Sequence, residues 1–288
     1  MAHARIKINN LMKTIVTHIF PDLDAITSAW LLTRYLPEWE DAEIVFTPQQ
    51  KNWNNVVPDS NPDILYCDTG CGKFDHHQIQ ERTCASRRIL DYLIMQDHVS
   101  GKNKEPLLRI INYVNEIDNF GEVNYPDPTS DKYEFCLRQL ITGLKKEGMS
   151  DLTLVQTVFP LLDGVLQLFI YKLKAEAAIA KGFVFDSKYG KSLAMSTSND
   201  EAMRLAQKKG FSLVVMKDAI KKTARIKTLP SPELDLTPVY EKIMKIDSRG
   251  TWFLHILKNM LLNGSSRTPD SIPTPLSLQK LIEIIKEV

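Results

Sequence analysis

One stretch near the amino terminus, residues 14–30, constrains the fold more than any other part of the sequence. It opens with the apolar, β-branched run Thr14-Ile-Val-Thr, reaches His18, and continues to Asp22 and Asp24, after which a helical pattern of apolar residues follows at once. This order predicts a buried strand, a loop at its carboxyl end and then a helix. Ligands bind at such loops in open α/β sheets. Two carboxylates crowded beside a histidine there are unfavourable unless a cation neutralises them.

A second group of possible metal ligands follows another predicted strand. The apolar run at residues 63–66 leads to Asp68, and Asp75, His76 and His77 come soon afterwards. Hard carboxylate oxygens mixed with imidazole nitrogens suit Mn²⁺, Fe²⁺ or Zn²⁺ better than Ca²⁺. A carboxylate shared between two such ions would produce the two-metal geometry used for phosphoester hydrolysis.

Ordinary loop structure is the alternative explanation for these polar residues. Asp24 could cap the helix that begins near Ala25, and Asp68-Thr-Gly could be a simple turn. Neither explanation accounts for the joint placement of so many ligand-type residues at strand ends, so a metal site is the favoured interpretation.

The order of these motifs resembles the DHH phosphoesterase superfamily. His-x-x-x-Asp-x-Asp, a lone Asp at a strand end and Asp-His-His follow one another, and Asp118 in Glu116-Ile-Asp118-Asn-Phe matches the remaining metal motif on a later helix. The resemblance covers roughly residues 14–120. The more specific MYG-type exonuclease and oligoribonuclease-like branches are possible placements. The resemblance implies a metal-dependent phosphoesterase that hydrolyses ester bonds.

The resemblance also implies roles for individual residues. The centre would hold two divalent ions, with Mn²⁺ expected and Mg²⁺, Co²⁺ or Fe²⁺ as alternatives. The implied ligands are His18, Asp22 and Asp68 for one ion, and Asp24, Asp68, His76 and Asp118 for the other. Asp68 would therefore bridge the two ions. Asp75 would orient a histidine, and His77 would face the substrate as the catalytic group.

The hydrophobic patterns predict an α/β fold with two domains joined by a helix. A chain of 288 residues with 43% hydrophobic content is long enough for one large or two modest domains. The expected divisions are a flexible arm at 1–12, a catalytic domain at 13–148 with a doubly wound parallel sheet, a connecting helix at 149–182, and a smaller α+β substrate-binding domain at 183–288. Pro160 should kink the connecting helix or mark its start.

Two stretches of the predicted second domain could bind substrate. One contains Arg249 and His255, and the other is the loop Gly264-Ser265-Ser266-Arg267. A loop rich in glycine and hydroxyl groups with an arginine can bind phosphate, although a turn with a surface arginine explains the same residues. The resemblance implies a carboxy-terminal substrate domain with a Gly-rich loop and therefore favours binding. Trp252 or Phe253 could stack on a nucleobase.

The expected substrate is a nucleotide or a short single-stranded nucleic acid, cleaved at a phosphodiester or phosphomonoester bond. An inorganic pyrophosphatase-like hydrolase and a non-catalytic nucleotide-binding module are the alternatives. A net charge of +1 does not indicate a general nucleic-acid binder. The absence of an 18-residue apolar run and of a signal-like amino terminus predicts no membrane association. Four cysteines without a metal-binding pattern suggest free thiols and a cytoplasmic location. A homodimer remains open.

Overall fold

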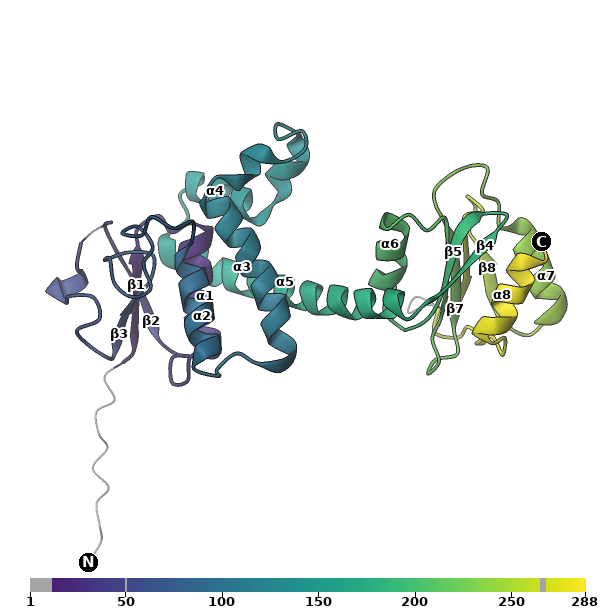
Figure 1. The fold of residues 1–288 in the computed structure, drawn as a ribbon, viewed down its shortest axis with the longest axis horizontal. Helices are drawn as coiled ribbons and strands as arrows, with labels where there is room; N and C mark the ends of the chain where they lie inside the picture. Colours follow the sequence, from purple (N-terminus) through teal and green to yellow (C-terminus); the bar gives the residue numbers. More distant parts are fainter. Residues whose placement is uncertain (1–11, 50, 265–267) are drawn as a thin grey trace, which may run out of the picture. The chain divides into compact units, whose positions relative to one another are not determined.

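The computed structural model describes residues 12–49, 51–264 and 268–288, which fall into two compact units. Unit 1 contains the described residues up to Ile170, and unit 2 contains those from Tyr171 onward. The boundary lies inside one long helix, α5 (Asp151–Ala180), which is drawn in teal in Figure 1. Each unit has its own hydrophobic core.

Unit 1 is built on a parallel three-stranded sheet. Its strands are β1 (Thr14–His18), β2 (Glu43–Thr47) and β3 (Ile64–Tyr66), in the order β2-β1-β3. The helix α1 (Leu23–Tyr35) joins β1 to β2, as expected for a crossover between parallel strands. The predicted mixed α/β architecture with a parallel sheet is therefore present in unit 1.

Helices cover one face of this sheet, as Figure 1 shows. They are α1, α2 (Ala85–Met95), α3 (Lys104–Asp118), α4 (Leu137–Lys146) and the first part of α5. Ile15 and Leu65 of the sheet share one buried cluster with helical residues such as Trp30. On the opposite face, the Tyr66 hydroxyl donates to the carbonyl of Val56, 2.7 Å away, in the loop that follows a short 3-10 helix at Trp53–Asn55. A loop therefore covers Tyr66, where a doubly wound sheet would place a helix.

Helix α5 contributes to the cores of both units. Leu154 and Val158 are fully buried in unit 1, and Ala175 is fully buried in unit 2. The helix runs without interruption through Pro160, so this proline does not mark its start. By length and composition alone α5 could cross a membrane, although no apolar run of that length was expected from the sequence. The core helix of a soluble protein passes the same test, so one such helix among the described residues is weak evidence.

Unit 2 contains a mixed six-stranded sheet in the order β4-β5-β6-β7-β9-β8. Only β5 and β6 pair in parallel, and the helix α6 (Asp200–Lys208) connects them. The strands are β4 (Phe183–Ser187), β5 (Gly190–Ser196), β6 (Leu213–Lys217), β7 (Ala224–Thr228), β8 (Trp252–Leu254) and β9 (Met260–Asn263).

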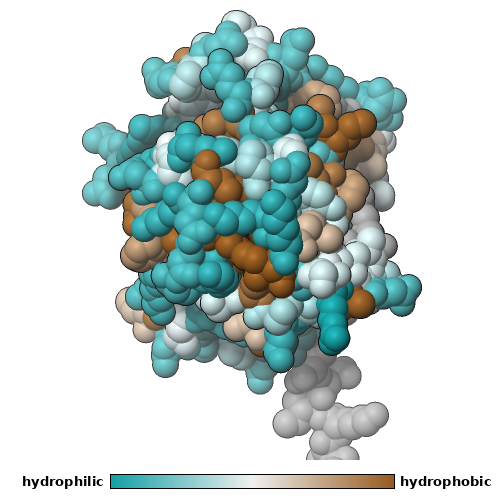
Figure 2. Space-filling model, turned by 90° about the vertical axis from the view of Figure 1, so that its right-hand side faces the viewer, coloured by the Kyte–Doolittle hydropathy of each residue, from teal (hydrophilic) through white to brown (hydrophobic). Residues whose placement is uncertain are grey.

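Helices flank both faces of the unit 2 sheet. Helix α6 packs on one face with the end of α5, while α7 (Thr237–Ile246) and α8 (Leu278–Lys286) pack on the other (Figure 1). Asn199 caps α6, because its side chain accepts a hydrogen bond from the backbone amide of Glu201. On the face drawn in Figure 2, hydrophobic residues occur in small groups interrupted by hydrophilic ones.

Candidate metal centre

The parallel pairing of β1 and β3 brings the first two motifs together. Thr14 pairs with Ile64, so the carboxyl ends of both strands meet at one edge of the sheet. His18 is the last residue of β1, and Asp68 follows β3 with a left-handed backbone (φ 55°), which aspartate tolerates better than most residues. As a result, His18 Nε2 lies 3.3 Å from Asp68 Oδ2.

The tight loop behind Asp68 depends on a glycine. Gly70 has φ +81°, and a Cβ atom there would lie only 2.8 Å from side-chain atoms of both Pro58 and Tyr66. No other residue type would fit this position without moving its neighbours. The loop is therefore held close to the edge of the sheet where Asp68 lies.

The two aspartates of the first motif have different structural roles. The side chain of Asp22 caps α1 by accepting bonds from the backbone amides of Asp24 and Ala25, at 2.9 and 3.1 Å. The alternative in which Asp24 caps this helix is therefore wrong. Asp24 lies inside α1 and accepts from the amides of Ala85 (2.7 Å) and Ser86 (3.0 Å), which begin α2.

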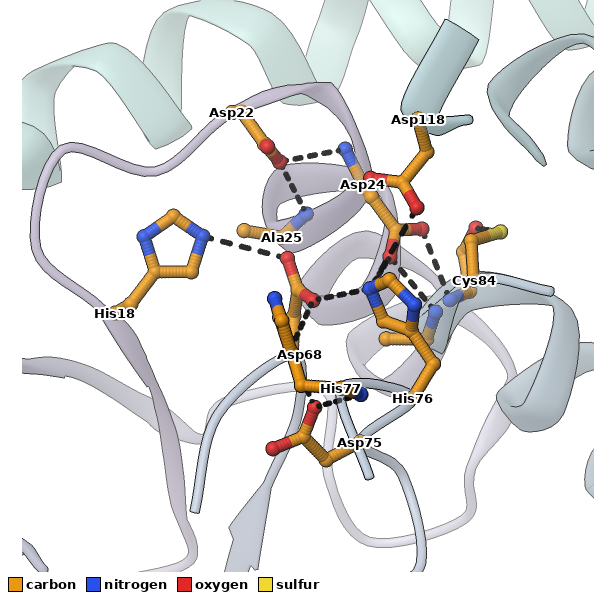
Figure 3. A network of polar contacts seen from close by, with 12 residues as sticks. His18, Asp22, Asp24, Ala25, Asp68, Asp75, His76, His77, Cys84 and Asp118 are labelled. Atoms are coloured by element: carbon orange, nitrogen blue, oxygen red, sulfur yellow. Dashed lines mark hydrogen bonds and ion pairs between the residues drawn. The ribbon is translucent and has the colours of Figure 1, made fainter. Parts of the chain in front are cut away.

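His76 lies at the centre of the remaining carboxylates (Figure 3). Its Nε2 atom is 3.2 Å from Asp68 Oδ1, 3.5 Å from Asp118 Oδ2 and 4.0 Å from Asp24 Oδ2. Asp118 is the last residue of α3, which brings its carboxylate to the edge of the sheet from a distant part of the chain.

All six predicted metal ligands therefore lie in one place. They fall into two groups whose possible ligand atoms lie within 4.8 Å of one another: His18, Asp22 and Asp68, and Asp24, His76 and Asp118. A third such group combines Asp68 and His76 with His77. The Asp68 carboxylate contacts both groups, since Oδ2 faces His18 and Oδ1 faces His76. This arrangement could hold two ions with Asp68 between them.

Asp75 orients His77 and does not join the ligand groups. Its Oδ1 atom lies 2.7 Å from His77 Nδ1 and also accepts from the His77 backbone amide, while Oδ2 accepts from the amide of Cys71. His77 is 43% exposed and its Nδ1 atom is 3.8 Å from Asp68 Oδ1. Gln49, which sequence reasoning missed, places its Nε2 atom 3.2 Å from the other ring nitrogen of His77.

Crowding of carboxylates shifts their titration. Burial raises the pKa of Asp24 to about 8, and repulsion from Asp68 and Asp118 adds to this effect. Burial likewise raises the pKa of Asp118 to about 6. Burial would also raise the pKa of Asp68, but the close contacts of its carboxylate with His18 and His76 outweigh burial and lower that pKa. The site thus favours bound cationic groups between its carboxylates.

The pKa values of two histidines are also raised. Burial would lower the pKa values of His18 and His76, but contact with the negatively charged Asp68 carboxylate raises both to about 9. The hydrogen bond that the His77 ring donates to the Asp75 carboxylate raises the pKa of His77. A metal ion would have to displace these protons before binding the imidazoles.

Three buried polar atoms of the cluster lack a hydrogen-bond partner and would gain a partner if a metal ion bound. Asp68 Oδ1, His76 Nε2 and Asp118 Oδ2 are buried and form no hydrogen bond to the described residues. Burying such atoms without partners is costly. The mixed carboxylate and imidazole donors suit Mn²⁺, Fe²⁺, Co²⁺ or Zn²⁺.

Two of the predicted substrate residues of unit 2, His255 and Gly264, are not brought together. A cavity of about 460 Å³ is lined by Gly264, Arg225 and Lys221, among others, but by neither Arg249 nor His255. Ser265, Ser266 and Arg267 lie outside the described residues. The register of the β8–β9 hairpin explains the separation of His255 from Gly264. Trp252 pairs with Asn263, next to Gly264, whereas the His255 amide bonds to Met260 at the opposite end.

The expectation that Trp252 stacks on a base is wrong. Trp252 is 7% exposed, packs in the core of unit 2 and donates its indole N–H to Asp247 Oδ2 at 2.9 Å. Its neighbour Phe253 is 55% exposed, because successive side chains of a strand point to opposite faces.

Sequence reasoning also missed a cavity of about 260 Å³ beside the metal centre. Asp22, Asp24 and Asp118 line it together with residues of α3, α4 and the turn after α3. Among those residues are Phe120, Arg138 and Lys145. Only the packing of α4 in unit 1 shows that its cationic side chains line the same cavity as the carboxylates.

Comparisons with known proteins give only distant similarities. No family model matches this chain, and no curated protein matches it significantly. Among solved structures, an exopolyphosphatase-related protein from Bacteroides fragilis has 13% identity and a TM-score of 0.27, with 95% of this chain and 90% of that one covered. RecJ from Thermus thermophilus, in complex with Mg²⁺, has 11% identity and a TM-score of 0.31. That alignment covers 96% of this chain but 49% of RecJ.

Proposed function

We propose that this protein is a two-metal phosphoesterase that cleaves a phosphodiester or phosphomonoester of a nucleotide or a short single-stranded nucleic acid. The position of Asp68 carries the proposal. One carboxylate oxygen faces the His18 group and the other faces the His76 group. A bridging carboxylate between two ligand sets is the arrangement that two-metal hydrolysis requires. The motif resemblance to DHH phosphoesterases supports the same reaction class.

Residues of this chain would serve two roles, which are to bind the ions and to transfer a proton. Two bound divalent ions would supply Lewis acidity and a water of lowered pKa. The residues that would hold them are His18, Asp22, Asp24, Asp68, His76 and Asp118. His77 is partly exposed beside these ligands, and its contact with Asp75 raises its pKa, which favours the protonated form. It would donate a proton to the leaving oxygen, with Asp75 holding its ring in place.

The proposal also covers the cellular location and the oligomeric state of the enzyme. The four cysteines are free thiols, of which Cys67 and Cys84 are buried, and this supports a reducing, cytoplasmic location. The proposal involves no membrane, because the buried residues of α5 belong to protein cores. A homodimer is compatible with it.

Hydrolysis of a substrate panel with Mn²⁺ tests the proposal. The panel contains a short oligoribonucleotide, a linear and a cyclic dinucleotide, a 3′-phosphonucleotide and pyrophosphate. We expect turnover of at least one nucleotide substrate by the wild type, none by Asp68→Ala, and full activity in Asp91→Asn, which changes an exposed carboxylate on α2. Turnover of pyrophosphate alone would indicate an inorganic pyrophosphatase. Binding of metal and nucleotide without turnover would indicate a non-catalytic module.

A further inference from the structure

The cavity beside the metal centre has two chemically different sides. Asp22, Asp24 and Asp118 form one side, and Arg138 and Lys145 of α4 contribute cationic groups to the other. Apolar side chains of α3 and α4 complete the lining: Val114, Ile117 and Ile141. A ligand that suits this lining carries both an anionic group and an apolar surface.

Phe120 gives the cavity an exposed aromatic ring. The residue is 70% exposed although it lines the cavity, and its backbone is left-handed (φ 57°), a conformation that bulky residues rarely adopt. Strained conformations of this kind persist where the surroundings enforce them, and they concentrate at functional sites.

The surroundings of Phe120 do enforce its position. On one side, the side-chain amide of Asn119 donates to the carbonyls of Asn115 (2.8 Å) and Thr83 (3.2 Å). On the other side, Gly121 is buried so tightly that a Cβ atom would lie 2.8 Å from the carbonyl oxygen of Glu116. The turn after α3 therefore holds the ring outward at the cavity instead of burying it.

Arg138 retains hydrogen-bonding capacity toward the cavity. Its Nη1 atom donates to Gln139 at 3.0 Å, and Nη2 lies 3.7 Å from Glu122 Oε1, beyond hydrogen-bond distance. A guanidinium has five N–H donors in a planar fork that matches phosphate oxygens. Lys145, in contrast, donates to the carbonyls of Phe20 (2.7 Å) and Pro21 (3.3 Å), so Arg138 is the better phosphate ligand.

We propose that this cavity is a nucleotide subsite, in which the base stacks on Phe120 and the phosphate contacts Arg138. The inference rests on the proposed function and identifies a substrate-binding element within unit 1. The volume of about 260 Å³ lies below the roughly 300–1,000 Å³ of pockets that enclose whole drug-sized ligands. The cavity therefore does not enclose the ligand fully, and part of a bound nucleotide stays at its exposed rim, where Phe120 lies.

Equilibrium binding of AMP and of adenosine to the Mn²⁺-loaded protein separates the two contacts. Phe120→Leu keeps an apolar side chain but removes the stacking face, so it should weaken both ligands by about tenfold, the scale of one base–aromatic stack. Arg138→Gln should weaken AMP by a similar factor, about tenfold for a charge-assisted contact, and leave adenosine unchanged. Lys146→Ala, an exposed cation on α4 that does not line the cavity, is the matched control and should change neither.

The binding measurements test the nucleotide subsite without any measurement of turnover. Mn²⁺ binding is measured for each variant, and it should equal that of the wild type, which excludes misfolding. Unchanged binding of both ligands by Phe120→Leu would overturn the stacking site, and equal losses for AMP and adenosine in Arg138→Gln would overturn the phosphate contact. If the wild type hydrolyses no substrate but shows the expected binding pattern, the proposed function fails while the nucleotide subsite stands.

Discussion

The Nδ1 atom of His77 lies 2.7 Å from Oδ1 of Asp75, a carboxylate that is only 1% exposed. The same oxygen also accepts from the His77 backbone amide. This contact fixes the ring while leaving its other nitrogen toward Gln49 and the open side of the metal centre. Asp75 thus acts through His77 and not as a metal ligand, a distinction that mutation can test.

Replacing Asp75 with Asn should lower kcat by about 10–100-fold, the usual cost of removing a partner that orients a residue at a metal site. Mn²⁺ stoichiometry should stay the same. Because Asp75 raises the pKa of His77, its removal should lower that pKa, and the high-pH limb of the rate profile should move to lower pH. An unchanged pH profile with unchanged kcat would show that His77 does not transfer the proton.

Mn²⁺ affinity should increase as pH rises from about 6 to 9. The raised pKa values of Asp24 (about 8), His18 and His76 (about 9) mean that these groups carry protons at neutral pH in the protein without metal. Protons and metal compete for the same atoms, so a higher pH favours the metal. Calorimetry in buffers with different ionisation enthalpies should detect proton release on binding, and an affinity independent of pH would contradict this competition.

Lys145 should strengthen Mn²⁺ binding by one of the two ligand groups, the group formed by His18, Asp22 and Asp68. Its ammonium group donates to the carbonyls of Phe20 and Pro21, in the loop between His18 and Asp22. Lys145→Met should therefore weaken Mn²⁺ binding at the His18–Asp22–Asp68 group more than at the Asp24–His76–Asp118 group. Titration monitored by electron paramagnetic resonance would resolve two affinities, of which only one should change. Lys146→Met is the control, and equal weakening of both sites would contradict a local effect.

Trp252 should matter for stability and not for ligand binding. Trp252→Phe leaves Asp247 Oδ2 without its 2.9 Å indole donor in the core of unit 2. The expected loss is about 1–3 kcal/mol in the free energy of unfolding, measured with urea. Phe253→Leu, at a 55% exposed position on the same strand, should cost much less. A loss of nucleotide affinity in Trp252→Phe without a loss of stability would restore the stacking role.

The sequence was sufficient to predict the strand ends that form the metal centre. Continuous apolar runs placed β1 and β3, and parallel strands necessarily meet at their carboxyl ends, so His18 and Asp68 could be expected together. The helical pattern before Asp118 placed that carboxylate at a helix end. Local patterns and the motif order thus carried most of the information about this site.

The parts that could not be predicted depend on contacts between distant segments. The separation of His255 from Gly264 follows from the register of β8 against β9, and β9 itself was not predicted. Similarly, Arg138 belongs to no motif, and its place beside Asp22 follows from the packing of α4 in unit 1. Pairing register and helix packing are set by tertiary structure, which short sequence patterns do not encode.

The number of metal ions bound by the wild type and by Asp68→Asn tests the central claim most directly. Asparagine keeps the shape of the side chain but loses the charge that both ligand groups share. We predict two Mn²⁺ ions per wild-type chain, two for the control Asp91→Asn, and one or none for Asp68→Asn, with hydrolysis lost in parallel. Two ions bound with unchanged affinity in Asp68→Asn, or only one in the wild type, would contradict a centre bridged by Asp68.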